Sequence, residues 1–86
     1  MLSIIYEKQA SKFLKKLTVQ DDVKRIFGEV EALAVNPFPK EAARVEGYRD
    51  AKVFRVRVGQ YRILYVVDYE KEKLYVMAID KRERVY

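Results

Sequence analysis

The spacing of apolar residues predicts one strand followed by two helices in the first part of the chain. Residues 2–6 are short, apolar and β-prone, which is typical of a strand. In residues 8–17 the apolar side chains recur at helical spacing with lysines between them, which indicates an amphipathic helix. A second apolar stripe covers residues 23–34, with Thr18 as the expected cap of its helix. That helix must end before Asn36-Pro37, because proline disfavours helical dihedral angles in the residue before it.

The second part of the chain has the pattern of three consecutive strands. They are expected at about residues 52–58, 61–69 and 73–80. Gly59-Gln60 is a two-residue turn with glycine first, which suits a type II′ hairpin. Residues 36–51, between the second helix and these strands, are expected to be an irregular connection.

The order β-α-α-β-β-β predicts an α+β fold. Two helices with a short connection form an antiparallel hairpin, and we expect this helical hairpin to pack on one face of an antiparallel sheet. The other face of the sheet should stay open. At this length, residues 1–86 are expected to form a single domain. The position of the first strand in the sheet does not follow from the pattern.

Composition limits the chemistry of the chain. There is no cysteine and no histidine, so disulfides, thiolate metal sites and the usual general base are all excluded. The acidic residues form no DxD-like cluster, and we expect neither a metal nor another cofactor. Any catalysis must therefore use Lys, Arg, Tyr, Asp, Glu, Ser or Thr.

The distribution of charge points to the second part of the chain as the site for an anionic partner. The net charge is +5. Residues 1–50 carry nine basic and eight acidic groups, whereas residues 51–86 carry nine basic and five acidic groups, so most of the excess positive charge lies in the second part. No stretch approaches the roughly twenty apolar residues of a membrane span, and the N-terminus does not have the pattern of a signal peptide. We therefore expect a cytoplasmic protein with no membrane partner.

The predicted hairpin brings arginines together. With Gly59-Gln60 as its loop, Arg57 lies opposite Arg62, and Arg55 points to the same face of the sheet. The residues that alternate with them are apolar and should pack on the helices: Phe54, Val56, Val58, Tyr61, Ile63 and Tyr65. Two guanidinium groups about 6–7 Å apart repel each other by roughly 0.6 kcal/mol in water. An anion that bridges them would turn this repulsion into binding.

The end of the chain should reach the same end of the sheet. In an up-and-down arrangement of strands, the segment from Lys81 to Tyr86 meets Arg57 and Arg62. Two interpretations remain open, a phosphate site and a solvated basic edge that prevents strand-to-strand aggregation. A phosphate site would suit cleavage of RNA by its own 2′-hydroxyl group, which needs positioning, proton transfer and stabilisation of a negatively charged phosphorane. A tyrosine could stack on a splayed base.

Two segments resemble RelE-type toxins of the RelE/ParE toxin superfamily. Residues 53–65, VFRVRVGQYRILY, resemble the central hairpin of that family, and residues 81–86, KRERVY, resemble its C-terminal catalytic segment. The order of elements is similar too, so the resemblance covers essentially the whole chain. It implies a toxin of a type II toxin–antitoxin pair, a metal-independent endoribonuclease that cleaves mRNA in the decoding site of the ribosome.

The resemblance also implies roles for individual residues. Arg62 would stabilise the transition-state phosphate, Arg82 would stabilise charge and protonate the leaving 5′-oxygen, and Tyr86 would stack on or orient the nucleotide. Arg57 completes the expected catalytic set. The expected contacts to RNA come from four further basic residues: Lys52, Arg55, Lys81 and Arg84. The family often has lysine at the positions of Arg55 and Arg57. A guanidinium group does not give up its proton near neutral pH, so these arginines are poor general bases. The general base therefore stays unassigned, with Tyr86 as a candidate.

The expected partners are mRNA on the ribosome, including contacts to rRNA, and a cognate RelB-like antitoxin. Two alternatives remain open at this point. One is a ParE-like inhibitor of DNA gyrase, which the same scaffold would serve. The other is a module that binds RNA or ribosomes without cutting.

Overall fold

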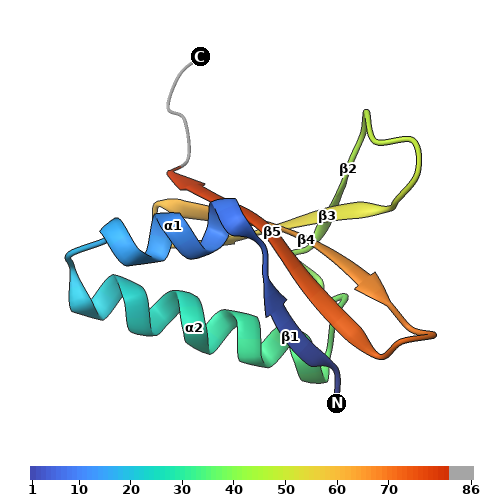
Figure 1. The fold of residues 1–86 in the computed structure, drawn as a ribbon, viewed down its shortest axis with the longest axis horizontal. Coiled ribbons are helices and arrows are strands. Elements are labelled where there is room, and N and C mark those ends of the chain that lie inside the picture. Colours follow the sequence, from blue (N-terminus) through green and yellow to red (C-terminus); the bar gives the residue numbers. More distant parts are fainter. Residues whose placement is uncertain (82–86) are drawn as a thin grey trace.

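The computed structural model of the protein describes residues 1–81, and Figure 1 shows the arrangement of its helices and strands. Within these residues the chain forms two helices and one five-stranded sheet. The elements in chain order are β1 (Ser3–Tyr6), α1 (Lys8–Lys16), α2 (Gln20–Val35), β2 (Ala43–Val45), β3 (Val53–Val58), β4 (Tyr61–Asp68) and β5 (Lys73–Lys81). The predicted helices and the last three strands agree with these bounds to within a few residues.

The sheet has the strand order β1-β5-β4-β3-β2. The three strands β3, β4 and β5 pair antiparallel, as predicted, and β2 adds to β3 antiparallel. β1 instead pairs parallel with β5 at the edge, from Ser3 opposite Lys73 to Tyr6 opposite Val76. The sheet is therefore mostly antiparallel rather than wholly so. The pairing of β4 with β5 shifts by one residue, which makes Met77 the extra residue of a bulge.

Two local predictions were wrong. The connection 36–51 is not irregular throughout, because Ala43–Val45 pairs with β3 as the short edge strand β2. Three residues are too few for an alternating pattern to stand out. Thr18 does not cap the second helix either, since α2 begins after Val19 and the cap residue makes no side-chain hydrogen bond. Asp21 and Asp22 do lie in the first turn of α2, where the helix dipole favours negative charge.

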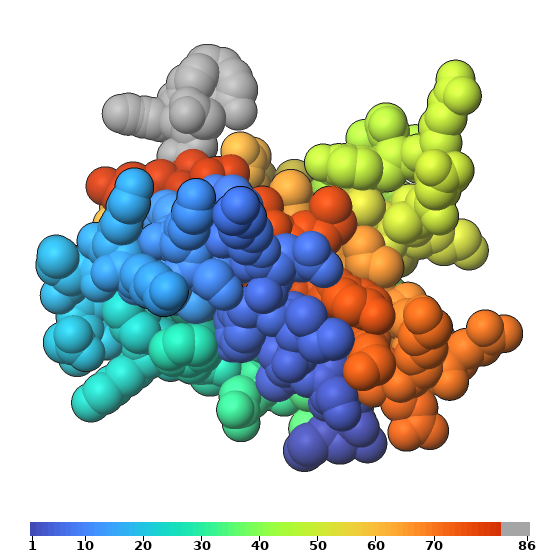
Figure 2. All heavy atoms as spheres, viewed as in Figure 1, coloured from blue at the N-terminus to red at the C-terminus, as the bar shows by residue number. Residues whose placement is uncertain are grey.

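Both helices cover the same face of the sheet, as predicted (Figure 1). The apolar stripe of each helix meets the alternating apolar residues of the strands. The core combines Ala10 of α1 and Ile26, Val30, Leu33 and Ala34 of α2 with Val56, Val58, Tyr61, Ile63, Tyr65, Leu74, Val76 and Ile79 of the sheet. Figure 2 shows the helices over one part of the surface and the segment between β2 and β3 projecting from the body of the molecule.

Two core tyrosines form hydrogen bonds through their hydroxyl groups. The Tyr65 hydroxyl donates a hydrogen bond to the Pro37 carbonyl oxygen at 2.6 Å, and the Tyr61 hydroxyl donates one to an Asp22 carboxylate oxygen at 2.7 Å. Both rings are buried, which confirms that they serve the core. The bond to Asp22, with burial, raises the pKa of Tyr61 above its usual value. These bonds fix β4, the strand that carries Arg62, against α2 and the loop after it.

No helix within residues 1–81 has the length and apolar character that crossing a bilayer requires.

Candidate anion-binding site

The arginines of the β3–β4 hairpin lie as the sequence predicted. Arg57 of β3 is directly opposite Arg62 of β4, and Arg55 pairs with Leu64 on the same face of the sheet. This face is opposite to the one that the helices cover, because Val56 and Val58 on the alternate positions are in the core. Arg57 is exposed, and Arg55 and Arg62 are half-buried. Three guanidinium groups are thus carried by two adjacent strands on one face.

These arginines are not neutralised by neighbouring carboxylates. Within residues 1–81, none of Arg55, Arg57 and Arg62 forms an ion pair or a side-chain hydrogen bond. Asp80 of β5 is the cross-strand partner of Arg62 in the register, yet the two side chains form no ion pair. Among the described residues the three cations are therefore available to an anion from outside the chain.

The tight turn sets the register that places these cations. Gly59 has φ +58°, and Gln60 has no positive φ, which is the pattern of the predicted type II′ turn. The guanidinium group of Arg25, on α2, packs over this turn. A Cβ atom added to Gly59 would lie 3.3 Å from Nη2 of Arg25. Arg25 therefore adds a fourth cation at the same end of the sheet. Its position in an amphipathic helix gave no sign of this contact.

The end of β5 meets the hairpin as expected, and Gln9 of α1 holds it there. Lys81 pairs with Tyr61, and Asp80 pairs with Arg62. Gln9 accepts a hydrogen bond from the Ile79 N–H at 2.9 Å. Its amide nitrogen donates to the Ile79 carbonyl oxygen at 3.2 Å and to Asp80 Oδ1 at 3.4 Å. Gln9 was absent from the predicted site, because a polar residue on a helix surface does not reveal a partner seventy positions away.

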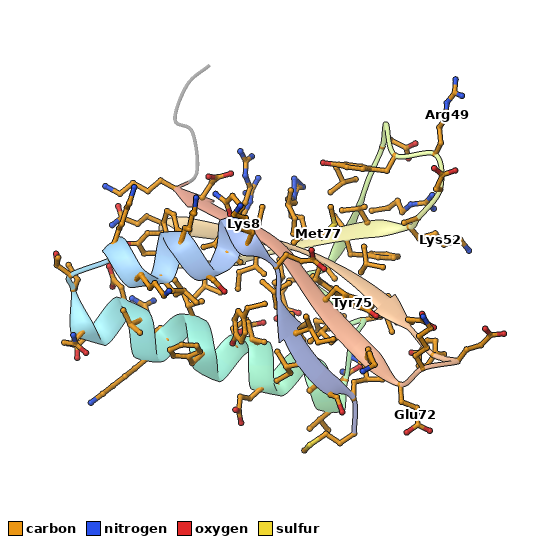
Figure 3. The ribbon with its side chains drawn as sticks, viewed as in Figure 1. Lys8, Arg49, Lys52, Glu72, Tyr75 and Met77 are labelled. Carbon is orange, nitrogen blue, oxygen red and sulfur yellow. The ribbon has the colours of Figure 1, made fainter. Side chains whose placement is uncertain are left out.

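Lys52 lies apart from the arginines. It precedes β3, so about 16 Å of strand separates it from Arg57, and Figure 3 shows it at the far end of that strand. Its side chain lines a cavity of about 410 Å³ with Phe38, Phe54, Val67 and Tyr69. The structure therefore does not bring Lys52 into the expected group of RNA contacts around the hairpin.

The remaining predicted site residues, Arg82, Arg84 and Tyr86, lie outside the described residues, so their roles stay predictions. What residues 1–81 present is a surface of guanidinium groups that suits a phosphodiester, since planar guanidinium binds phosphate through paired hydrogen bonds. Within the same residues, no group of three or more Asp or Glu side chains is arranged to hold a metal ion.

Comparison with known proteins identifies the family. The sequence profile described as "ParE toxin of type II toxin-antitoxin system, parDE" matches residues 4–86. The chain is 32% identical over 80 residues to a protein of Methanocaldococcus jannaschii named as toxin RelE1, a match that covers 92% of this chain and 88% of the relative.

Solved structures show the same fold. RelE in the archaeal RelE–RelB complex from Pyrococcus horikoshii superposes with a TM-score of 0.81 at 25% identity, with 98% of each chain covered. The isolated RelE toxin of E. coli superposes with a TM-score of 0.76 at 21% identity, covering 99% of this chain and 88% of that one. The chain therefore belongs to the RelE/ParE family of toxins from type II toxin–antitoxin systems.

Proposed function

We propose that this toxin is a metal-independent endoribonuclease that cleaves mRNA in the decoding site of the ribosome. The observation that carries the proposal is the pair of facing arginines, Arg57 and Arg62, which form no ion pair within residues 1–81. Like charges held opposite each other cost stability in the free protein, so an arrangement of this kind is best explained by an anionic substrate. The proposed activity requires the protein to share a compartment with ribosomes, which is the cytoplasm.

In the proposed reaction, the 2′-hydroxyl group of the RNA gives its proton to a general base and attacks the adjacent phosphorus. The new bond forms a 2′,3′-cyclic phosphate, and the P–O bond to the 5′-oxygen of the next nucleotide breaks as that oxygen takes up a proton. Arg62 stabilises the phosphorane through charge and hydrogen bonds, and Arg57 helps to hold the scissile phosphate. Arg55 and Lys81 contact the flanking backbone of the RNA.

The C-terminal segment supplies the remaining groups of the proposed site. Arg82 stabilises charge and protonates the leaving oxygen, Arg84 contacts backbone phosphate, and Tyr86 stacks on the nucleotide. Tyr86 is also the candidate general base.

The decisive experiment is cleavage of mRNA on a programmed ribosome, measured with purified toxin. We expect Arg62→Ala to reduce the rate at least about 100-fold, as loss of a charge-stabilising donor does in other enzymes, with an unchanged circular-dichroism spectrum. Arg44→Ala is the matched control, because Arg44 pairs with Phe54 and so points to the opposite face of the sheet. Full-rate cleavage by Arg62→Ala would contradict the proposal.

A second candidate function is inhibition of DNA gyrase, which the ParE description of the matching family favours. A supercoiling assay with gyrase, run beside the ribosome assay, separates the two. A toxin that blocks supercoiling and leaves mRNA intact would be a gyrase inhibitor. One that binds ribosomes with strong salt dependence and cuts nothing would be a non-catalytic binding module.

We also propose a RelB-like antitoxin as the protein partner. The support is the solved complex of the Pyrococcus horikoshii relative, whose toxin chain matches over almost its whole length. An adjacent reading frame that encodes a small acidic protein would fit the basic charge of this chain. Co-purification of the two products, with loss of cleavage in the complex, would support this pairing.

A further inference from the structure

The far end of β5 is an edge that β1 does not cover. β1 pairs with β5 only from Lys73 to Val76, and the last bond of this kind runs from the Glu7 N–H to the Val76 carbonyl oxygen at 2.9 Å. The bulge at Met77 follows, and α1 begins at Lys8. The backbone groups of Ile79 on this edge would lack partners there, were it not for a side chain.

That side chain is Gln9, whose amide makes the two hydrogen bonds that a neighbouring strand would otherwise make to Ile79. Its oxygen accepts from the Ile79 N–H at 2.9 Å and its nitrogen donates to the Ile79 carbonyl oxygen at 3.2 Å, so one amide satisfies both groups. The same nitrogen lies 3.4 Å from Asp80 Oδ1. Gln9 thus contacts the residue that stands directly opposite Arg62 in the sheet.

The position of Asp80 presents a difficulty for a phosphate site. Paired residues on antiparallel strands have Cα atoms about 4.5–5.5 Å apart, which lets an aspartate and an arginine form an ion pair. Such a pair would cancel the positive charge of Arg62 and fill its donors. Within the described residues, however, Asp80 has its hydrogen bond with Gln9 and none with Arg62.

We propose that Gln9 is a positioning residue that keeps Arg62 free for phosphate by holding the Asp80 carboxylate at the edge of β5. The inference rests on the proposed role of Arg62 as a phosphate-binding residue. Gln9 itself touches no substrate. It acts through Asp80, and its two bonds to Ile79 fix the strand segment from which that carboxylate projects.

This role differs from a purely structural one in a way that a second substitution reveals. Gln9→Leu removes the amide, so Asp80 turns toward Arg62 and competes with phosphate. Asp80→Asn removes the competing charge. If Gln9 acts on Arg62 through Asp80, then Asp80→Asn restores activity to Gln9→Leu. If Gln9 only stabilises the fold, the second substitution restores nothing.

The test compares single-turnover cleavage by the full chain and its variants on the programmed ribosome. We expect Gln9→Leu to be up to about fivefold slower, the factor at the upper end of the range for an exposed ion pair. The double variant Gln9→Leu/Asp80→Asn should return to the rate of the unaltered protein. Gln20→Leu, an exposed glutamine at the start of α2, is the matched control and should leave the rate unchanged. A normal rate for Gln9→Leu, or no recovery in the double variant, would overturn the inference.

Two additions keep the test decisive. Gln9→Glu retains an acceptor for the Ile79 N–H but repels Asp80, so it should be slowed like Gln9→Leu even if the leucine variant folds poorly. Binding of a 2′-O-methyl RNA trinucleotide, which cannot be cleaved through its 2′-oxygen, should follow the same order of variants and the same recovery. If the unaltered protein does not cut mRNA, the proposed function fails. The trinucleotide affinities then decide the role of Gln9 by themselves, and equal affinities across the variants would reject it.

Discussion

Arg57 and Arg62 face each other across two strands, and each lacks an ion pair within residues 1–81. A folding chain gains nothing from this arrangement, because opposite residues on one face of a sheet interact directly and like charges there are unfavourable. The same two groups can hold a single phosphate from both sides. At the scale of the residue, the arrangement that favours binding of a phosphate therefore lowers the stability of the free protein.

Replacing one of these arginines should make the free protein more stable. We expect Arg57→Gln to raise the free energy of unfolding by about 0.5 kcal/mol at low salt, since it removes a repulsion between exposed charges. The gain should shrink as salt screens the charges. Urea unfolding at low and high ionic strength measures both effects, and the cleavage assay should show a loss for the same variant. Lower stability at low salt would contradict this account.

The residues of the site differ in how far the sequence could predict them. The facing arginines followed from two simple rules, the alternation of side chains along a strand and the two-residue loop at Gly59-Gln60. Gln9 and Arg25 could not be found in this way, because both occupy polar positions of amphipathic helices. Their contacts with Ile79 and Gly59 depend on how the helices lie on the sheet, which local pattern does not encode.

At the scale of the element, the β3–β4 turn determines whether the arginines meet. Gly59 has φ +58°, a conformation that residues with a Cβ atom rarely adopt, and Arg25 packs against its backbone. A change of one residue in the register would move every side chain of a strand to the other face. The glycine therefore helps to keep the register that places the apolar residues on the core face of the hairpin and the arginines on the other face.

Two glycine substitutions should have opposite effects on stability. Gly59→Ala should lower the free energy of unfolding by about 1 kcal/mol or more, because the new Cβ atom is strained at positive φ and lies 3.3 Å from the Arg25 guanidinium. Gly28→Ala is the control. Gly28 lies inside α2 with nothing within 4 Å of an added Cβ atom, so alanine there should raise stability by about 0.5–1 kcal/mol. Thermal unfolding of both variants tests the pair, and a neutral Gly59→Ala would be the adverse result.

The elements that the sequence missed or left open are at the edges of the sheet. β2 is three residues long, and its pairing depends on β3 rather than on its own pattern. The place of β1 beside β5 brings together the first and last strands of the described chain, a contact that no local rule predicts. The helices and the central strands were predictable because long amphipathic patterns have a distinct period.

At the scale of the whole molecule, two tyrosines connect the sheet with the helices and loops, Tyr65 fully buried and Tyr6 half-buried. Tyr65 of β4 donates to the Pro37 carbonyl oxygen, beyond the end of α2. Tyr6 of β1 meets the ring of Phe27 on α2 edge to face, at 5.7 Å between centroids. Burial raises the pKa of both tyrosines from 10.0 to about 12, with further contributions from Glu31 at Tyr6 and Glu29 at Tyr65. The folded protein thus holds protons that the unfolded chain releases near pH 10.

This difference in tyrosine pKa between the folded and unfolded states predicts that the protein loses stability in alkali. Because the pKa is higher in the folded state, the stabilisation is complete below pH 10 and is lost as the pH rises from 10 to about 12. Tyr65→Phe should lower the free energy of unfolding by about 1 kcal/mol at neutral pH, since the Pro37 carbonyl loses its donor. It should also make the decline between pH 10 and 12 less steep, because one of the tyrosines whose pKa the fold raises is gone. Tyr69→Phe is the control for the loss at neutral pH, since Tyr69 is 62% exposed. Urea unfolding at intervals from pH 8 to 11.5 provides the measurement, and a free energy that stays constant above pH 10 would show that these hydroxyl groups are not held protonated by the fold.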